Sequence, residues 1–411
     1  MTQRDQQSYG ILAEQLAEVG IDVEGVKARL KATEIETPSW GYSDSGTRFG
    51  RFLQPAAAST IEEKLRDAAH VHKLTGIAPR VGVHVLWDFP SGTADVASVK
   101  DYATSLGVQI GSINPNVFQD QCYKYGSICG HEADVRKKAV DHILDSIEVG
   151  KAVGSDLLSL WFADGTNYPG QADFRRRKHW MEESLATSYA AMPPSMTMLV
   201  EYKFFEPGFY HTDLGDWGMS YVTCKQLGPQ AKVLVDLGHH PQGTNIEHIV
   251  AFLLDEGMLG GFHFNNRKYA DDDLTVGSMN PYEFFLILNE LMAAEADPSI
   301  DCPVAYGVDQ SHNEKPKIEA MVQTIMTIQT ALAKALIVDR KVLREAQNAG
   351  DIVAAENTLV AAFSTDVGPL VRKVREEMGL PLDPLAAHRA SGYAGKAAAE
   401  RGVRKGQGGL G

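Results

Sequence analysis

Short apolar segments alternate with longer amphipathic segments along most of the chain. Several of the short segments are nearly continuous apolar runs, which is typical of parallel strands buried on both faces. Eight such segments stand out, at residues 35–40, 81–87, 108–113, 157–162, 197–202, 233–237, 260–265 and 303–308. The pattern therefore predicts a parallel sheet with helices between its strands.

Helical periodicity occupies the intervals between these segments, for example at residues 59–76, 131–154, 244–257 and 280–294. The first of these opens with Ser-Thr and a following Glu, a capping signature, and ends at Gly76. A strand–helix unit repeated eight times predicts an α/β fold, the (β/α)8 TIM barrel. A doubly wound open sheet is the main alternative, but "WGYSDSGTRFG" lacks the GxGxxG turn that follows the first strand of such folds.

Three regions follow from this reading of the chain. Residues 1–34 look like an N-terminal helical segment, and residues 35–315 make the catalytic barrel. Residues 316–411 form a C-terminal helical extension that ends in "RKGQGGLG", a tail that we expect to be mobile. An extension of this size after a finished barrel is often used to pack against other subunits.

Composition narrows the classes of partner. The chain has 411 residues, 44% of them hydrophobic, which is enough for a large core. Its formal net charge of -14 disfavours nucleic acid, because proteins that bind a phosphate backbone carry a basic face. The acidic balance instead suits solubility and attraction for divalent cations. We expect a small-molecule substrate and no nucleic acid partner.

The cellular location is predicted from cysteine use and from the apolar runs. The four cysteines form no CxxC pair and no disulfide framework, which favours a reduced cytoplasm. The polar start "MTQRDQQSYG" has no apolar core for export. No stretch approaches the ~20 apolar residues of a membrane span. We therefore expect a cytoplasmic protein without a membrane partner.

Polar residues cluster where four consecutive strands end. Barrel enzymes place their chemistry at the C-terminal ends of strands and in the loops that follow. Four potential metal ligands lie at comparable depth there: Glu201, Asp236, His263 and Asp309. Each alone has an ordinary structural explanation, as a helix cap or a core histidine. Three carboxylates facing one axis would repel each other unless a cation lay among them, so the set predicts a metal site.

A second set of ligands lies beside the first, made of His239, Asp271 and Asp273. Two aspartates at i and i+2 of an extended chain project to one side, so Asp272 between them should point elsewhere. Glu201 has two oxygens and could bridge both sets. The sequence thus predicts two divalent ions per subunit, of a hard or borderline kind such as Mg²⁺, Mn²⁺ or Co²⁺, with Zn²⁺ also able to bind.

Lys203 lies two residues after Glu201 and so on the same side of the strand. A cation beside metal ions needs a task, and polarising a substrate carbonyl as negative charge develops there is one. Trp87, Trp161 and Trp40 could form apolar walls against the C–H face of a sugar, although tryptophans in a barrel are also ordinary core residues. These residues predict a site for a small carbonyl compound.

Four motifs strengthen this interpretation: "VEYKFFEPG", "VDLGHHPQGTNIE", "FHFNNRKYADDDL" and "GVDQSHNEKPK". Together they resemble the L-rhamnose isomerase family, within the xylose-isomerase-like barrels. The resemblance runs from the "WGYSDSGTRFGRF" segment to residue 315 with the motif spacing kept. It implies a Mn²⁺-dependent aldose–ketose isomerase, assembled as a homotetramer, that interconverts L-rhamnose and L-rhamnulose and extends to aldoses such as L-mannose or D-allose.

The resemblance also implies individual roles. The first set of ligands would hold a structural ion that binds substrate hydroxyls, and the second set a catalytic ion with its water. Lys203 would assist at the carbonyl, with Asp309 also counted among the catalytic residues, and His84 would help ring opening or hold the ring oxygen. Phe49 would reach the active site of a neighbouring subunit. The sequence leaves open whether hydrogen moves as a hydride or through an enediol.

Two alternatives keep the barrel and change the reaction. The nearer alternative is a ketose 3-epimerase or another sugar isomerase on the same barrel. Epimerases generally use one metal and two glutamate bases, so the pair Asp271 and Asp273 argues against an epimerase. A metal-dependent endonuclease or other hydrolase needs a basic face and usually more histidine ligands, which the charge of -14 and Lys203 disfavour. A binding protein without a reaction is also disfavoured, because buried carboxylates are costly to keep.

Overall fold

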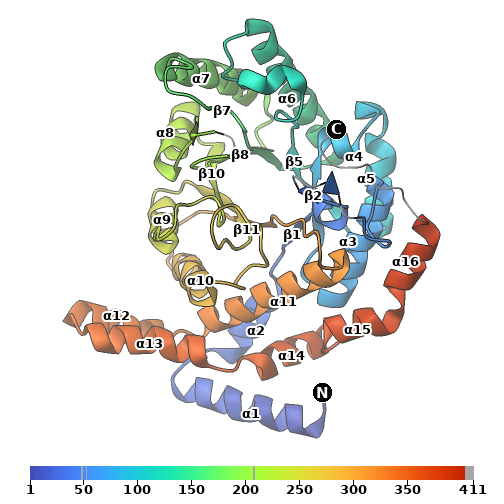
Figure 1. The fold of residues 1–411 in the computed structure, drawn as a ribbon. Coiled ribbons are helices and arrows are strands. Elements are labelled where there is room, and N and C mark those ends of the chain that lie inside the picture. The colour runs from blue at the N-terminus through green and yellow to red at the C-terminus, as the bar shows by residue number, and fades with distance from the viewer. Residues whose placement is uncertain (48–49, 52, 207–208, 403–411) are drawn as a thin grey trace.

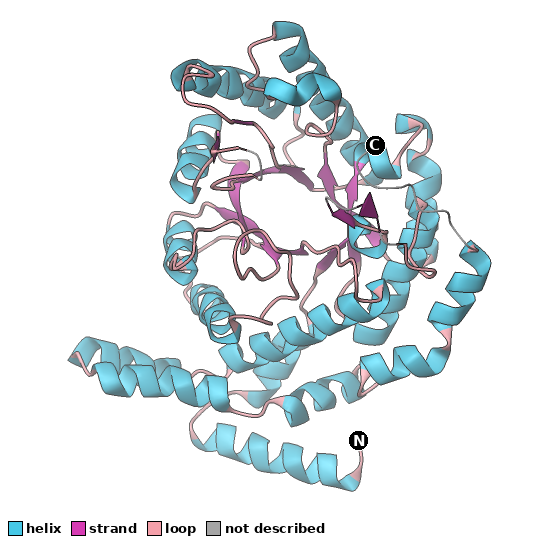
Figure 2. Ribbon diagram, viewed as in Figure 1, coloured by secondary structure: helices cyan, strands magenta, loops and turns pink. Residues whose placement is uncertain are grey.

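A closed barrel of eight parallel strands forms the centre of the protein (Figure 1 and Figure 2). The computed structural model describes residues 1–47, 50–51, 53–206 and 209–402. The barrel strands are β1 (Glu36–Pro38), β4 (Arg80–His84), β5 (Gln109–Asn114), β6 (Leu157–Leu160), β8 (Thr197–Glu201), β10 (Ala231–Asp236), β11 (Leu259–Phe264) and β12 (Ala305–Val308). Each is hydrogen-bonded to the next along the chain, and β12 closes onto β1. The predicted (β/α)8 fold is confirmed, and each predicted strand overlaps an observed one.

Helices surround this barrel in the order that the periodicity predicted (Figure 1). They are α3 (Ile61–Thr75), α4 (Val85–Asp88), α5 (Val96–Ser105), α6 (Ala133–Val153), α7 (Phe174–Ala191), α8 (Trp217–Leu227), α9 (Ile246–Asp255), α10 (Pro281–Glu295) and α11 (Lys317–Leu336). Helix α3 begins with a capping box between Thr60 and Glu63 and ends at Gly76 with φ of 76°. That left-handed conformation costs glycine little, which explains the residue found there.

The two ends of the chain lie together along one side of the barrel. The N-terminal helices are α1 (Gln3–Glu18) and α2 (Val23–Lys31), and the C-terminal ones are α12 (Arg340–Ala349), α13 (Ile352–Ser364), α14 (Gly368–Glu377), α15 (Pro384–Ser391) and α16 (Tyr393–Arg401). Helices α12 and α13 project from the body as a hairpin, while α14 to α16 follow its outside (Figure 1). Residues 403–411, which include the whole tail predicted to be mobile, lie outside the described residues.

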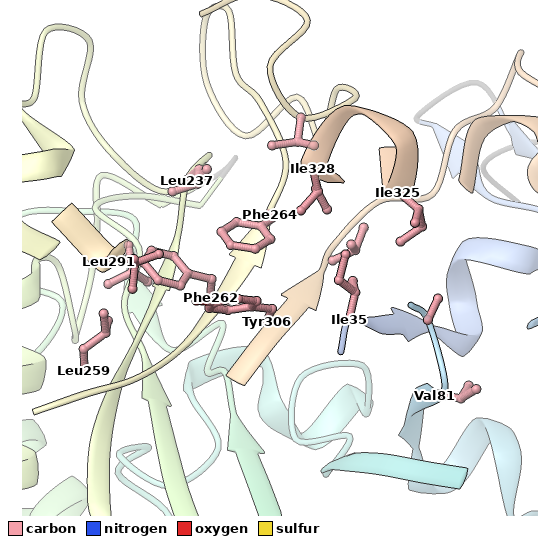
Figure 3. Close-up of a cluster of buried hydrophobic side chains, with 14 of the residues drawn as sticks. Ile35, Val81, Leu237, Leu259, Phe262, Phe264, Leu291, Tyr306, Ile325 and Ile328 are labelled. Atoms are coloured by element: carbon pink, nitrogen blue, oxygen red, sulfur yellow. The ribbon is translucent and has the colours of Figure 1, made fainter. Parts of the chain in front are cut away.

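Apolar packing between the strands and the helices makes the core (Figure 3). Phe262 and Phe264 of β11 stack with ring centroids 5.0 Å apart and pack with Leu237, Leu291 and Ile328 in one buried cluster. Burying one such side chain stabilises the fold by about 1.5–3 kcal/mol. Successive residues of a strand point to opposite faces. The alternation that sends both phenylalanines outward therefore turns His263 into the barrel.

One strand ends earlier than its apolar run suggests. The segment at residues 81–87 is extended only to His84, and Val85–Asp88 forms the turn of helix α4. The carboxylate of Asp88 accepts the backbone N–H of His84 at 3.0 Å and pairs with the ammonium of Lys64 at 2.5 Å. The Asp88 carboxylate thus stabilises a turn that begins right after His84. An apolar run in the sequence cannot show where such a turn begins. The side chain of Asp88 thereby serves the fold and not the site.

A helix that spans a membrane needs about 20 mostly apolar residues. Within the described part of the chain, no single helix has both the length and the apolar character to cross a membrane. The bent pair α11 and α12 passes by length and composition only. Helix α11 is largely buried against the barrel.

Candidate metal centre and active site

Adjacent barrel strands deliver the predicted ligands to the same end of the barrel. Glu201 and Asp236 are the last residues of β8 and β10, and His263 is the fifth residue of β11. Asp236 lies opposite His263 in the strand register, and His263 lies opposite Gly307, two residues before Asp309. Glu201, Asp236 and His263 are all buried. The fold therefore brings together the four ligands predicted for the first ion.

The described residues contain two overlapping groups that could hold a metal ion. The first comprises Glu201, Asp236 and His239, and the second Asp236, His263 and Asp309, with the ligand atoms of each group within 4.8 Å of one another. His239 Nδ1 lies 3.2 Å from Glu201 Oε1, and His263 Nδ1 lies 3.3 Å from the same oxygen. The residue common to both groups is Asp236, whereas the sequence interpretation gave the bridging position to Glu201.

The loop after β11 adds the aspartates of the second set. Asp271 Oδ2 lies 3.4 Å from His239 Nε2, and Asp273 Oδ1 accepts a hydrogen bond of 3.3 Å from Asn265. Asp273 has a φ of 46°, the one positive φ outside glycine among the described residues. The two aspartates thus converge through a tight turn and not through extended alternation. Strained backbone of this kind is concentrated at functional sites.

Asp272 points away from this centre, as predicted. Its carboxylate accepts the backbone N–H groups of Lys268 at 2.6 Å, Tyr269 at 2.7 Å and Ala270 at 3.4 Å. The side chain is exposed. Asp272 therefore shapes the loop that carries its neighbours and contributes no atom to the cluster of ligands.

The electrostatics of the cluster fit a divalent cation. Burial, together with the neighbouring carboxylates, raises the pKa of Asp236 to about 7 and that of Asp273 well above its ordinary value. Burial opposes a charge on His263, yet the carboxylate of Glu201 raises the pKa of this imidazole to about 10. The raised pKa values mean that these side chains hold protons, which offset the negative charge of the cluster. Because metal ions compete with protons for the same oxygens and nitrogens, this donor set suits a cation.

Two buried oxygens at the same place have no hydrogen-bond partner. They are Asp271 Oδ1 and Asn265 Oδ1. A Cβ added to Gly238 would lie 3.0 Å from the first oxygen and 3.1 Å from the second, so the two oxygens face the same small space. Leaving a buried acceptor unpaired costs about 1–3 kcal/mol. A hydrated cation would supply the missing partner. The described residues therefore fit a metal centre by charge, by ligand type and by unsatisfied atoms.

Lys203 lies between this cluster and an aromatic wall. Its ammonium donates a hydrogen bond of 2.7 Å to Asp271 Oδ2 and another to Glu206, and it lies 5.4 Å from the ring centroid of Trp161. Burial opposes the charge, but Asp271 and Glu206 together raise the pKa of Lys203 above its ordinary value. The group is therefore a protonated donor beside the metal ligands. Sequence reasoning found Lys203 and missed Glu206, which lies in a loop without any periodic signal.

Aromatic rings also line this end of the barrel, next to the metal ligands. His84 lies between Trp40 and Trp87, with ring centroids 4.7 and 4.1 Å away, and Phe118 lies 5.1 Å from Trp161. Burial lowers the pKa of His84 to about 3, so its imidazole is neutral, and its Nδ1 is buried without a hydrogen-bond partner. A neutral ring with a free nitrogen can accept a proton from a bound hydroxyl. Phe49, predicted to reach a neighbouring subunit, lies outside the described residues.

Two neutral side chains orient the carboxylates. Trp40 Nε1 donates to Asp309 Oδ1 at 2.8 Å, and Asn265 Nδ2 donates to both oxygens of Asp236 at 2.9 and 3.0 Å. Outer partners of this kind fix ligand geometry and tune metal affinity. Asn265 was missed from the sequence, although its position two residues after His263 places it on the same face of the chain.

Known proteins agree with the class that this fold and site define, a xylose-isomerase-like sugar isomerase. The chain is 43% identical over 406 residues to a probable sugar isomerase of Rhizobium meliloti (strain 1021), covering 98% of this chain and 94% of the relative. It is 40% identical over 411 residues to a probable sugar isomerase of Mesorhizobium japonicum, covering 98% and 95%. The chain therefore belongs to this family of sugar isomerases. No family model matches it.

More distant relatives bear on the substrate and on the fold. An L-rhamnose isomerase of Rhodopirellula baltica is 24% identical over 281 residues, which cover 61% of this chain and 64% of the relative. The solved structure of an L-ribulose 3-epimerase superposes with a TM-score of 0.52 at 14% identity, covering 77% of this chain and 98% of the other. A xylose isomerase domain protein from Alicyclobacillus acidocaldarius gives a TM-score of 0.51 at 15% identity, covering 74% and 99%. At such low identity, both structures agree on the fold alone.

Proposed function

We propose that this protein is a divalent-metal-dependent aldose–ketose isomerase that interconverts L-rhamnose and L-rhamnulose. The observation that carries the proposal is Lys203, a buried ammonium that lies 2.7 Å from Asp271 beside two overlapping groups of metal ligands. A fixed ammonium there can stabilise a carbonyl oxygen that gains negative charge. The net charge of -14 separately disfavours a hydrolase that acts on nucleic acid. The rhamnose assignment is supported by the four motifs and by the distant likeness to an L-rhamnose isomerase.

The ligands would be divided between two Mn²⁺ ions. Glu201, Asp236, His263 and Asp309 would hold the ion that positions the sugar, and His239, Asp271 and Asp273 the ion nearer the carbonyl. Such ions, when bound, supply Lewis-acid polarisation of the sugar oxygens and a bound water of lowered pKa. Asp236 and Asp273, whose pKa values burial raises, would release their protons as the ions bind and so supply the negative charge that the ions require.

The side chains around the ligands account for the remaining steps. Neutral His84, whose ring lies between Trp40 and Trp87, would accept a proton from the ring hydroxyl as the sugar opens. Protonated Lys203 would donate to the carbonyl oxygen of the open chain, exchanging its bond to Asp271 for one to substrate. Trp40, Trp87 and Trp161 would cover the apolar face of the sugar and exclude water from the reacting carbons.

A panel of aldoses tests this proposal. Purified protein with Mn²⁺ would be given L-rhamnose, L-mannose, L-lyxose, D-allose, D-ribose and D-xylose, and ketose formation would be measured with EDTA-treated protein as the control. We expect the fastest conversion with L-rhamnose and none after EDTA. Exchange at C3 of a ketose without formation of an aldose would instead identify a 3-epimerase.

The same assay in heavy water separates the two chemical routes. Deuterium at C1 or C2 of the product requires a proton that has exchanged with solvent, and so an enediol. Deuterium in the product would therefore rule out direct transfer of hydrogen between the two carbons. Both outcomes keep the isomerase, because the route is a separate question from the reaction.

A further inference from the structure

A cavity of about 380 Å³ opens at the N-terminal end of the barrel, the end opposite the metal ligands. Its walls come from the beginnings of the strands, including Glu36 of β1, Arg80 of β4, Thr197 of β8 and Lys232 of β10. Small-molecule sites in proteins commonly measure ~300–1,000 Å³. We call this space the floor cavity. The proposed reaction makes no use of it.

Two glycines let a carboxylate lie inside the barrel beside the floor cavity. Barrel interiors are usually filled by layers of bulky branched side chains. Here a Cβ on Gly111 would lie 1.8 Å from Glu36 Oε2, and one on Gly82 would lie 2.7 Å from Glu36 Oε1. Both glycines thus admit a carboxylate into the barrel, where the backbone N–H of Ser112 donates to it at 2.7 Å. An ordinary apolar core would need no such arrangement.

One hydroxyl in the wall of the floor cavity is left without a partner. Ser159 is 2% exposed, and its Oγ has no hydrogen-bond partner among the described residues. Its neighbours Leu158 and Leu160 are buried in the apolar core, so strand alternation turns Ser159 into the barrel. Leaving a buried hydroxyl without a partner destabilises the folded chain. An occupant of the cavity would remove that cost.

The wall of the floor cavity carries charges of both signs, from Glu34, Glu36, Asp156, Arg80 and Lys232. Arg80 pairs with Asp156 and has its Nε 3.8 Å from Glu36 Oε2, while Lys232 donates to the carbonyl of Gly257. Because neither sign dominates the wall, a ligand of net charge gains little attraction there. Hydrogen-bond donors, acceptors and hydroxyl groups line the cavity beside apolar side chains such as Leu199. Such a wall suits a neutral molecule with many hydroxyl groups.

The floor cavity extends from the surface of the protein to the ring of His263. Its mouth adjoins a surface groove of about 550 Å³, with Glu34, Pro303, Val304 and Tyr306 lining both. Its inner end reaches His263, whose Nδ1 faces Glu201 on the other side at 3.3 Å. An occupant would contact the ring of a metal-site histidine from below.

We propose that the floor cavity binds a neutral polyol or sugar of about six carbons, as a second site beneath His263. The site is independent of the aldose on which the proposed reaction runs. Its partners are the free hydroxyl of Ser159, the carboxylate of Glu36 and the guanidinium of Arg80. Binding there would couple to the metal centre through the imidazole of His263.

Calorimetric titration with sorbitol, a polyol without a carbonyl, tests the proposal. The metal-loaded full chain should bind two sorbitol molecules per subunit, one at each end of the barrel. Ser159→Leu fills the floor cavity and should bind one, whereas the control Ser98→Leu, at an exposed position on α5, should bind two. After EDTA treatment the wild-type chain should retain the floor site and Ser159→Leu should bind none.

A crystal of the wild-type chain soaked in sorbitol keeps the test decisive if Ser159→Leu fails to fold. Sorbitol density beneath His263, in contact with Ser159, would support the proposal. Density confined to the C-terminal end of the barrel would overturn it, as would the loss of all sorbitol binding when the wild-type chain is treated with EDTA. Neither result bears on ketose formation, so the floor site and the proposed function fail separately.

Discussion

At the scale of single residues, the metal ligands depend on neutral partners as much as on one another. Trp40 donates to Asp309 at 2.8 Å and Asn265 donates to Asp236 at 2.9 Å. Both hydrogen bonds fix a carboxylate whose pKa burial raises. The orientation of these oxygens is therefore set before any cation arrives, which is how a protein makes a site specific.

Replacing Trp40 by phenylalanine tests this role. The variant keeps an aromatic ring and loses the donor to Asp309, so Mn²⁺ affinity should fall by about 10–100-fold. Titration of Mn²⁺ followed by electron paramagnetic resonance would measure the loss. Trp180→Phe, on α7 and in contact with Arg136 and Arg176, is the matched control and should bind as the wild type does. Equal affinity in both variants would contradict the role.

The aspartate run offers a comparison within three residues. Asp271→Ala and Asp273→Ala each remove an oxygen from the centre and should lower kcat/KM by at least about 100-fold. Asp272→Ala removes only acceptors for loop N–H groups. It should keep activity within about tenfold of the wild type and lower the thermal midpoint instead. An inactive Asp272→Ala with normal metal content would contradict this division.

How far single residues could be predicted depends on the backbone that carries them. Glu201, Asp236 and His263 belong to regular strands, where alternation fixes the face of each side chain. Asp273 belongs to a turn with a φ of 46°, and its approach to Asp271 could be guessed from chemistry but not from geometry. Glu206 reaches Lys203 from a loop, and no periodic pattern marks such a residue.

At the scale of elements, the strands and caps were predictable and the docking of the C-terminal helices was not. Apolar runs identify strands because both faces are buried, and Ser/Thr–Glu pairs identify helix starts. Helix α16 is held instead by Arg401, which donates to both oxygens of buried Asp67 at 2.7 and 3.0 Å. The partners are 334 residues apart, so no local pattern reports the contact.

Arg401→Ala tests the docking of α16. The change leaves the carboxylate of Asp67, which is fully buried, without its cation. Breaking one side of such a pair costs about 3–5 kcal/mol. Urea denaturation should show a loss of that size, and Arg344→Ala, at an exposed position on α12, should show almost none. An unchanged denaturation midpoint in Arg401→Ala would contradict the contact.

A second contact between the same regions should depend on pH. His70 Nε2 lies 3.0 Å from His388 Nδ1, and Tyr393 stacks on His70 at 4.0 Å. Burial lowers the pKa of His70 to about 4, with His388 and Lys73 acting in the same direction. In the unfolded chain His70 is protonated as the pH falls below ~6.5, whereas in the folded chain it is protonated only near pH 4. This contribution is therefore complete above pH ~6.5 and is lost as the pH falls toward 4.

Thermal melts of the wild type and of His70→Gln between pH 8 and pH 4 would measure this effect. Glutamine keeps a hydrogen-bonding side chain and cannot titrate, so its midpoint should fall less steeply below pH ~6.5 than the midpoint of the wild type. Other buried histidines whose pKa is lowered, such as His240, make the stability of both proteins fall with pH in the same way. Parallel curves would show that the contact between His70 and His388 does not respond to protons.

At the scale of the whole molecule, the barrel with its helical arm leads us to expect an assembly. Helices α12 and α13 stand clear of the barrel and expose Ile352 and Val353, at 78% and 68% (Figure 1). We predict that light scattering after size exclusion will find four chains of 44.8 kDa each. Ile352→Glu with Val353→Glu should shift this mass downward, whereas a monomeric wild type would contradict the prediction.

The central claim is that the buried carboxylates and histidines serve metal-dependent isomerisation of an aldose. The most direct measurement is ketose formation from L-rhamnose by metal-stripped protein as Mn²⁺ is added back, beside Asp309→Asn at the same concentrations. We predict that wild-type activity returns as two ions bind per subunit, while Asp309→Asn folds normally, binds less metal and stays inactive. Equal activity of the stripped protein, or full activity of Asp309→Asn with unchanged metal content, would contradict the claim.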